Sequence, residues 1–443
     1  MADSNDVQRI LDLALRVGEM LLSNGAGAAD VSATMSSLTL HLGLRNVTAD
    51  VTFTSLNLTY QPHTDELPYS LTRHVTHREI DYDDLTRVDH LVRRLLTNRV
   101  DLTQARIELA RLAATGHQRP RWAITTSWGV IGGSVGLLLG GDWIVVLVAT
   151  VAALGINVLG RWFARGRLPF FYQQAAGGLF ATLLVVLLRI ADIPVDPSLL
   201  VTASIIMLLA GLGFIGAIQD ALTGFYLTAS ARLLEVSMAT IGIIVGVGGG
   251  LNTASVLGVS VVVEPGRVAW SHLPIMVFGA GLCAAAFAYS VYVPIRALPH
   301  VGLIGGAASL VYFGLFIQGF QGAWASALAA TVIGLLSYGA AARSSVPPLA
   351  IVVPAILPLL PGLSIYRSLS LIAEGQSGGV LAMATAAGIA IALAAGVILG
   401  EYIAQPLGGE VRRLERRLSG PRLVGPLRNW SRQRRNRRRG AGS

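Results

Sequence analysis

Apolar and polar positions follow two different patterns on either side of residue 120. From Val7 to Leu22 apolar residues recur at helical spacing, and from Val47 to Tyr60 they alternate with polar residues. The first pattern predicts an amphipathic helix that ends at Asn24-Gly25, and the second predicts a β-strand. Further helices are predicted over 30–42, 85–98 and 102–114, and a weaker strand over 67–75. Residues 1–118 are therefore expected to form a small α+β domain.

Beyond Arg121 the chain contains apolar runs of about 20 residues, the length that crosses a hydrocarbon core about 30 Å thick. Ten spans are predicted, at 122–140, 142–160, 172–190, 198–218, 236–263, 273–293, 300–317, 321–341, 348–362 and 380–403. The composition agrees, because the chain is 53% apolar and 13% charged, whereas a soluble domain carries about 25% charge. The sequence thus predicts a polytopic α-helical membrane protein.

Arginine marks one side of this predicted topology. The connections on the side of the N-terminal domain are rich in arginine: Arg161, Arg165, Arg167, Arg232, Arg296 and Arg343. By the positive-inside rule, both termini are then cytoplasmic. The basic tail, residues 406–443, is predicted to contact anionic lipid on that side rather than nucleic acid.

Two short motifs lie 151 residues apart. Leu209-Ala210-Gly211-Leu212 is similar to Leu360-Pro361-Gly362-Leu363, and the hydropathy of the spans repeats at about the same distance. We therefore expect two five-helix units, residues 119–265 and 266–405. Because five is odd, the units would cross the membrane in opposite senses, as the inverted repeats of secondary transporters do. A chance match of a Leu-Gly-Leu frame in so apolar a chain is the alternative.

Prolines interrupt the apolar run that holds the second motif, LPLLPGLSIYRSL from Leu357 to Leu369. A proline breaks a helix, and irregular backbone inside a membrane is tolerated where it lines a cavity. Free N–H groups there could hold the carboxylate of a substrate, and free carbonyls its ammonium group. The candidate substrate-binding residues are Gly211, Gly213, Pro361, Gly362, Ser364, Tyr366, Arg367 and Asn252. The alternative is a proline kink that serves only helix packing.

Two carboxylates near the motifs are candidates for proton coupling, because a proton-driven carrier usually places an ionisable group in its membrane part. Asp220 follows the first motif and Glu374 follows the second. For both, a loop carboxylate in solvent is the alternative.

Other chemistry has little support in the sequence. The glycines between 246 and 250 lack the preceding strand and the Lys-Ser/Thr pair of a phosphate-binding loop. His74 and His77 would point to opposite faces of a strand, so no metal site is predicted. No nucleophile motif is found, so neither a catalytic residue nor a cofactor is expected.

The segment LDLALRVGEMLLSNGAGAADVSATM, the strand VTADVTFTSLNLTY and the helix pair ending in QARIELARL resemble the N-terminal domain of the threonine/serine exporter family. The segment LPLLPGLSIYRSL resembles the Leu-x-Pro-Gly part of its C-terminal half. This resemblance implies ten spans in a bacterial inner membrane and a cytoplasmic N-terminal domain. It also implies export of small hydroxy amino acids driven by the proton-motive force, and it implies no catalytic residue.

Two other functions are left open by the residues themselves. One is a membrane-anchored hydrolase whose N-terminal domain is catalytic, and the other is a non-transporting scaffold or sensor. A small amino acid is the expected partner of an exporter, and assembly into a homo-oligomer is also left open.

Overall fold

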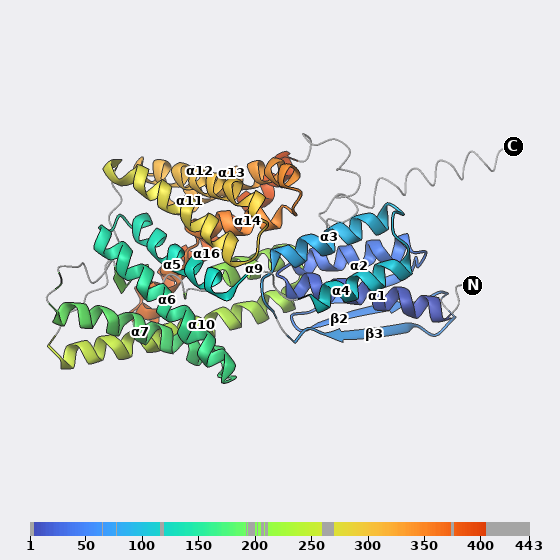
Figure 1. The fold of residues 1–443 in the computed structure, drawn as a ribbon, viewed down its shortest axis with the longest axis horizontal. Coiled ribbons are helices and arrows are strands. Elements are labelled where there is room, and N and C mark those ends of the chain that lie inside the picture. The colour runs from blue at the N-terminus through green and yellow to red at the C-terminus, as the bar shows by residue number, and fades with distance from the viewer. Residues whose placement is uncertain are drawn as a thin grey trace.

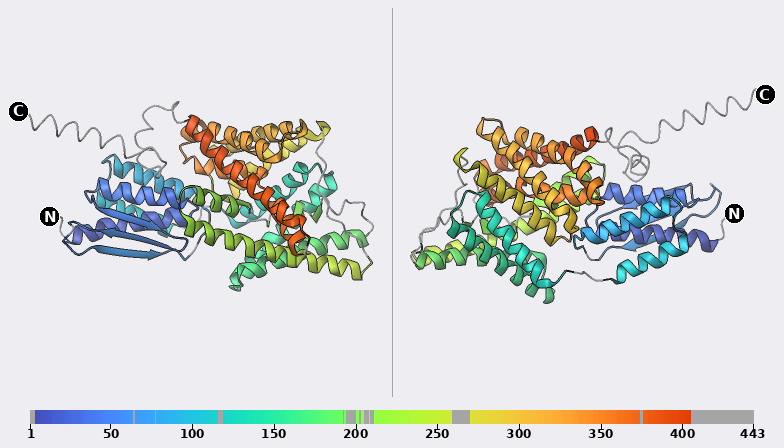
Figure 2. Two further views of the ribbon diagram at one scale, coloured as in Figure 1. Left: turned by 180° about the vertical axis from the view of Figure 1, so that it is seen from behind. Right: turned by 45° about the horizontal axis from the view of Figure 1, so that its top comes forward.

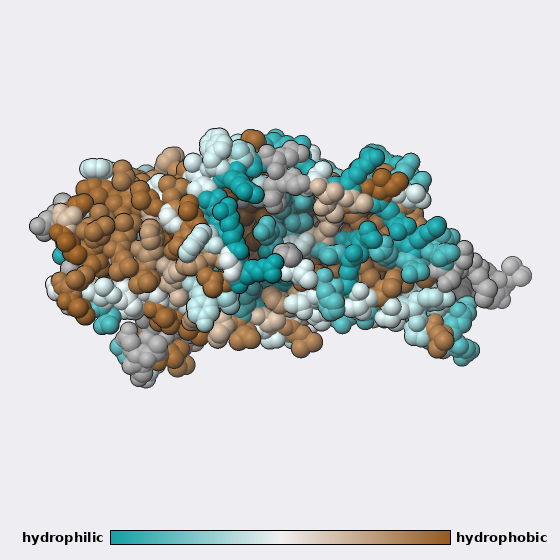
Figure 3. Space-filling view, turned by 60° about the horizontal axis from the view of Figure 1, so that its bottom comes forward, coloured by the Kyte–Doolittle hydropathy of each residue, from teal (hydrophilic) through white to brown (hydrophobic). Residues whose placement is uncertain are grey.

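The computed structural model describes residues 4–404 except 64, 77, 116–118, 192, 194–199, 202, 205–207, 209–210, 259–269 and 374–375. An N-terminal domain lies at one end of the long axis, and long helices fill the rest of the molecule (Figure 1). Hydrophobic residues cover the helical end of the face in Figure 3, and hydrophilic residues cover the N-terminal domain. This contrast in surface chemistry is that expected when one part faces lipid and the other faces water.

The N-terminal domain packs four helices against a three-stranded antiparallel sheet. The helices are α1 (Ser4–Ser23), α2 (Ala28–His41), α3 (Tyr82–Leu96) and α4 (Leu102–Ala114), and the strands are β1 (Val47–Val51), β2 (Ser55–Tyr60) and β3 (Tyr69–His74), in the order β1-β2-β3. Leu56 and Leu58 of β2 are fully buried and alternate with partly exposed residues. One face of the sheet therefore carries the core.

The strand predicted over Val47–Tyr60 is wrong in one respect, because it is a hairpin of two strands. Thr52 N donates to Ser55 O at 2.9 Å, and Ser55 N donates to Thr52 Oγ1 at 3.1 Å. This turn contains neither glycine nor proline, so the period-two alternation runs through it unbroken. Pairing of Val51 with Leu56 then places the two strands in register.

Within the described residues, seven helices are long and apolar enough to cross a membrane. They are α6 (Trp143–Arg165), α7 (Phe170–Ile190), α10 (Tyr226–Val256), α11 (Leu273–Ser290), α12 (Leu298–Ile317, after the short helix η2, Ile295–Ala297), α13 (Gly322–Ser344) and α16 (Gly378–Ala404). The other helices of this region are α5 (Arg121–Leu138), which is less apolar, and the shorter helices α9 (Gly211–Leu222), α14 (Leu349–Ile356) and α15 (Gly362–Ala373).

Three of the ten predicted spans thus do not appear as long apolar helices. The first corresponds to α5, which is 18 residues long and carries four glycines. The fourth, 198–218, lies partly outside the described residues, and its described end is the start of α9. The ninth, 348–362, is divided into α14 and the 3-10 helix η3 (Leu357–Leu359).

The helices of the two halves contact one another in matching pairs. In the first half α5 packs on α6, α7 on α10, and α9 on α10. In the second half α11 packs on α12, α13 on α16, and α15 on α16. Contacts between the halves match as well, since α10 packs on α15 and α16 packs on α9.

The α7–α10 and α13–α16 seams repeat in detail, because in each of them three glycines would place a Cβ only 2.0–2.9 Å from a carbonyl oxygen. In the first seam the contacts are Gly242 with Phe171, Gly246 with Ala175 and Gly178 with Ile243. In the second they are Gly396 with Ala327, Gly400 with Thr331 and Gly334 with Val397. The offset is 156 residues from α7 to α13 and 154 residues from α10 to α16 throughout. Such close approach of two backbones requires glycine, as in other tightly packed membrane helices.

Helices α5 and α11, which begin the two predicted five-helix units, pack against each other in opposite directions. A Cβ on Gly279, in the second turn of α11, would lie 2.8 Å from the backbone N of Leu138, the last residue of α5. At the other end, Arg119, just before α5, donates to the carbonyls of Tyr289 and Val293, where α11 ends. The first residues of α5 therefore lie beside the last residues of α11.

The N-terminal domain touches both halves of the helical region. Tyr82 N, at the start of α3, donates to Val291 O at 3.0 Å, just after α11. Thr228, at the start of α10, donates to Val51 O at 3.4 Å. From behind, α9 and the start of α10 can be seen to reach the domain (Figure 2).

Candidate functional site

The two motifs predicted to be equivalent meet in the structure. Helix α9 begins at Gly211 and α15 begins at Gly362, and both are 12 residues long. A Cβ on Gly211 would lie 3.0 Å from Leu360 Cβ, so the start of α9 touches the residues that lead into α15. The contact joins segments 151 residues apart in the sequence.

Prolines explain why the chain breaks before α15. Helix α14 ends at Ile356, η3 follows, and Leu360 is extended, with φ −63° and ψ 135°. The residue before a proline avoids the helical region, and here Leu360 precedes Pro361. Helix α15 then starts afresh, as Ile365 N donates to Pro361 O at 2.9 Å. The break is thus encoded locally.

The ends of α9 and α15 that meet are both N-terminal ends. The first N–H groups of a helix have no partner within it, and they carry the positive end of the helix dipole. Two such ends brought together form a position that favours an anion, such as the carboxylate of an amino acid.

Not every predicted site residue lies at this junction. Gly213 packs on α10, since a Cβ there would lie 2.7 Å from Val236 Cγ2. Asn252 is exposed near the end of α10, about 24 Å along the helix axis from Val236. The structure therefore does not bring Asn252 to the junction.

The remaining predicted residues belong to α15 or follow it. Pro361 is buried, Ser364 in the first turn is half-buried, and Arg367 is exposed. Tyr366 also belongs to α15, and Glu374 lies outside the described residues.

Sequence reasoning missed Ser368, one turn after Ser364. Its side chain is fully buried, donates to Ile365 O at 2.8 Å and lies 3.5 Å from Met383 Sδ of α16. The sequence could have indicated Ser368, because Ser364 is a predicted site residue and residues four apart lie on the same face of a helix. Ser368 therefore faces the helix on which α15 packs.

Asp220 is not the solvated loop carboxylate of the alternative interpretation. It belongs to the last turn of α9 and is 1% exposed. Its Oδ1 accepts a hydrogen bond from Ala28 N at 3.2 Å, at the start of α2. Arg232 Nε of α10 lies 3.1 Å from Oδ2, within ion-pair distance, although its N–H does not point at the oxygen. A buried carboxylate with two partners in different parts of the chain links those parts.

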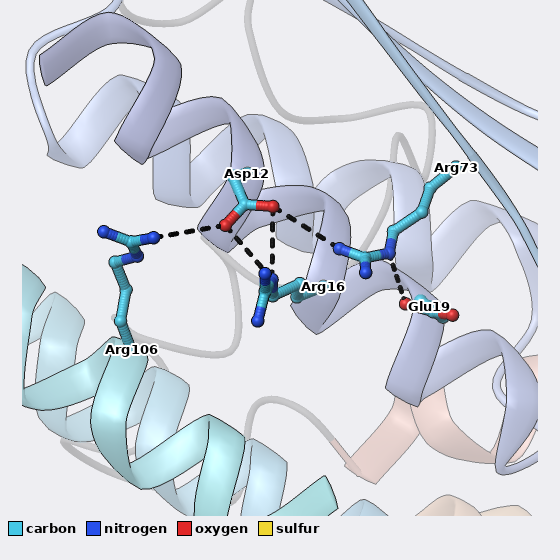
Figure 4. A network of polar contacts seen from close by, with 5 residues as sticks. All are labelled: Asp12, Arg16, Glu19, Arg73 and Arg106. Carbon is cyan, nitrogen blue, oxygen red and sulfur yellow. Dashed lines mark hydrogen bonds and ion pairs between the residues drawn. The ribbon is translucent and has the colours of Figure 1, made fainter. Parts of the chain in front are cut away.

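A second polar network lies inside the N-terminal domain (Figure 4). Asp12 on α1 forms ion pairs with Arg16, with Arg73 of β3 and with Arg106 of α4, and Arg73 also pairs with Glu19. All five side chains are partly exposed, where ion pairs contribute little individually. The network joins three elements, so we assign it to the fold of the domain.

These features define a polytopic membrane protein with two packed helical halves that meet at the starts of α9 and α15. Residues 12–254 match the family model described as "Putative threonine/serine exporter", and residues 276–403 match a second one, "Threonine/Serine exporter, ThrE". The chain belongs to the threonine/serine exporter family.

Curated relatives agree over most of the chain. It is 34% identical over 418 residues to a probable threonine/serine exporter of Mycobacterium tuberculosis, covering 91% of this chain and 78% of the relative. It is 31% identical over 415 residues to a threonine/serine exporter of Corynebacterium glutamicum, covering 92% and 85%. A probable succinate transporter subunit, YjjP of Escherichia coli, is 25% identical over 239 residues, 53% of this chain and 91% of the relative. No solved structure matches the chain.

Membership of this family makes the protein a transporter rather than an enzyme, so the hydrolase alternative falls away. The family and the apolar helices fit a multi-pass bacterial membrane protein.

Proposed function

We propose that the protein exports threonine and serine from the cytoplasm, driven by the proton-motive force. The two full-length relatives are named for these substrates. The observation that carries the proposal is the contact between Gly211 and Leu360, which brings together the start of α9 and the residues that lead into α15.

The proposed architecture is ten crossings in two inverted five-helix units, residues 119–265 and 266–405. The repeated glycine seams support equivalence of the units, and the opposite directions of α5 and α11 support inversion. Helix α9 and helix α15 would each be the second part of a broken crossing, so both would begin near the membrane centre.

The substrate carboxylate is proposed to bind the first N–H groups of α15 and α9, at Gly362 and Gly211. The carbonyls freed where α14 ends before Pro361 would receive the ammonium group. The Ser364 hydroxyl is the nearest side-chain partner for the substrate hydroxyl along α15, and Tyr366 and Arg367 are further candidates. Asn252 is left out of the proposed site.

Proton coupling is assigned to Asp220 or Glu374. Asp220 lies within the described residues and is buried, which suits a group that changes its charge during transport. The orientation proposed is the one inferred from arginine placement, with both termini cytoplasmic and the basic tail 406–443 against anionic lipid.

The test is efflux of labelled threonine and serine from proteoliposomes with and without a proton gradient. Replacing Pro361→Ala together with Gly362→Ala should restore a continuous helix, and we expect efflux to fall at least about tenfold. Gly314→Ala, in open space on α12, is the matched control and should leave efflux unchanged.

Two outcomes would count against the proposal. Unchanged efflux in the double variant would remove the broken-helix site. Gradient-driven efflux of succinate without threonine or serine would assign the chain the substrate named for its shorter relatives.

A further inference from the structure

One end of α9 is held by the N-terminal domain. Asp220, in its last turn, accepts the N–H of Ala28, the first residue of α2. The N-cap of α2 is Gly27, which has no side chain to accept such a bond. A carboxylate 192 residues away therefore caps this helix, and it also interacts favourably with the helix dipole.

Arg232 reaches Asp220 by passing over a glycine. A Cβ on Gly216 would lie 2.5 Å from Arg232 Nη1, so any side chain there would displace the guanidinium. Gly213, Gly216 and Asp220 are three and four residues apart, and they share the face of α9 that packs on α10. Because Gly213 and Gly216 have no side chain, α10 can pack closely on this face of α9. Asp220 lies at the end of the same face.

The domain supplies a second cation to the same place. Arg78, in the loop before α3, is half-buried and lies 3.7 Å over the Phe53 ring. Burial, and then repulsion by Arg232, lower the pKa of Arg78 to about 10, against the attraction of Glu235 and Asp220. Arg78 thus remains a cation at neutral pH and faces the pair from the domain side.

A comparison of the two halves indicates that the carboxylate and the glycine of α9 are not repeated at the equivalent positions of α15. At the 151-residue offset of the motifs, the counterpart of Asp220 is Leu371 and that of Gly216 is Arg367. At these two positions the second half therefore has neither a carboxylate nor a glycine. The carboxylate of Asp220 lies in the half whose helices α9 and α10 reach the N-terminal domain.

The two ends of α9 connect the domain to the proposed substrate site. Twelve residues of helix span about 18 Å, from Gly211 at the junction to the turn that holds Asp220. A helix of this length moves as a rod, so a shift of α2 against α10 would shift the N–H groups at Gly211.

We propose that Asp220, Arg232 and the Ala28 N–H form a clasp through which the N-terminal domain positions α9. Asp220 is then a positioning residue rather than the proton carrier, which leaves Glu374 for that role. The effect on transport rests on the proposed function, whereas the effect on docking of the domain does not.

The replacements Asp220→Asn and Asp220→Ala separate the two roles. Asparagine keeps an oxygen that can accept the Ala28 N–H but cannot release a proton, and alanine loses both properties. For a clasp we expect Ala to lower the maximal efflux rate about tenfold and Asn to lower it less than about threefold. Equal loss of gradient-driven efflux in both variants would overturn the proposal and identify a proton carrier.

Hydrogen exchange at the first turn of α2 tests the clasp in the full chain without any transport. We expect the amide exchange there to speed up about tenfold or more in Asp220→Ala and to change little in Asp220→Asn. Unchanged exchange in the alanine variant would refute the clasp even if threonine and serine prove not to be the substrates.

If Asp220→Ala fails to fold, Gly216→Ala is the alternative test variant, because it keeps every polar group of the clasp. The added methyl group displaces Arg232, so we expect the same direction of change in exchange and efflux, with Gly339→Ala, in open space on α13, as the control. Equal behaviour of the two glycine variants would also overturn the proposal.

Discussion

The two halves of the helical region share their packing seams but hold their interrupted helices differently. In the second half, Pro358 and Pro361 fix the break before α15 through the backbone itself. In the first half, residues 198–222 contain no proline, and α9 is held at its far end by Asp220 and the N-terminal domain. The glycines that backbone contact requires thus recur in both halves, whereas α9 and α15 are held in different ways.

The seams provide the strongest test of equivalence. Gly246→Ala and Gly400→Ala place a methyl carbon 2.0 and 2.2 Å from carbonyl oxygens of the neighbouring helix. The backbones must separate, and we expect each change to destabilise the protein by about 3 kcal/mol or more. The measurement is the thermal midpoint and folded yield in detergent.

Glycines that face open space in the same two helices are the matched controls. Gly248→Ala in α10 and Gly388→Ala in α16 should be neutral or slightly stabilising, because alanine favours helix. A large loss in one seam and none in the other would show that the halves are not equivalent.

Next in size is the contact of the linker before α5 with the second half. Arg119 donates to the carbonyls of Tyr289 and Val293, and its guanidinium lies 4.3 Å over the Tyr289 ring. Burial lowers the pKa of Arg119 from its ordinary value, but the group stays charged at neutral pH. Arg119→Gln should weaken the contact of this linker with the end of α11 by about 1–3 kcal/mol.

The readout is protease cleavage between the domain and α5, which should accelerate in Arg119→Gln. Arg121→Gln, two residues on and exposed, is the control. If both variants behave alike, Arg119 does not hold the linker against the end of α11.

Much of the fold followed from the sequence, because periodicity and span length are local properties. The helix over 102–114 was predicted with the bounds that the structure has, and the motif glycines Gly211 and Gly362 are the first residues of their helices. The turn at Thr52 was missed, because it is made by hydroxyl groups rather than by glycine or proline.

The partners of Asp220 could not be predicted from the sequence either, but for a reason different from that of the turn at Thr52. Ala28 contributes only its backbone N–H, and Gly216 contributes only the absence of a side chain. Because neither role depends on the chemistry of a side chain, no residue type in the sequence indicates these contacts. By contrast, the 154- and 156-residue offsets of the seam glycines were present in the sequence, and only the structure shows which carbonyl each one meets.

The smallest expected effect comes from the remaining contact of the domain with the first half. Thr228→Val keeps the shape of the buried side chain but removes the hydroxyl that donates to Val51 O at 3.4 Å. So long a hydrogen bond contributes little, and we expect exchange of the β1–β2 turn amides to rise less than about fivefold. Thr253→Val, whose hydroxyl bonds within its own helix to Gly249 O, is the control. A tenfold rise would mean that Thr228 of α10, and not Asp220 of α9, is the principal anchor between the first half and the domain.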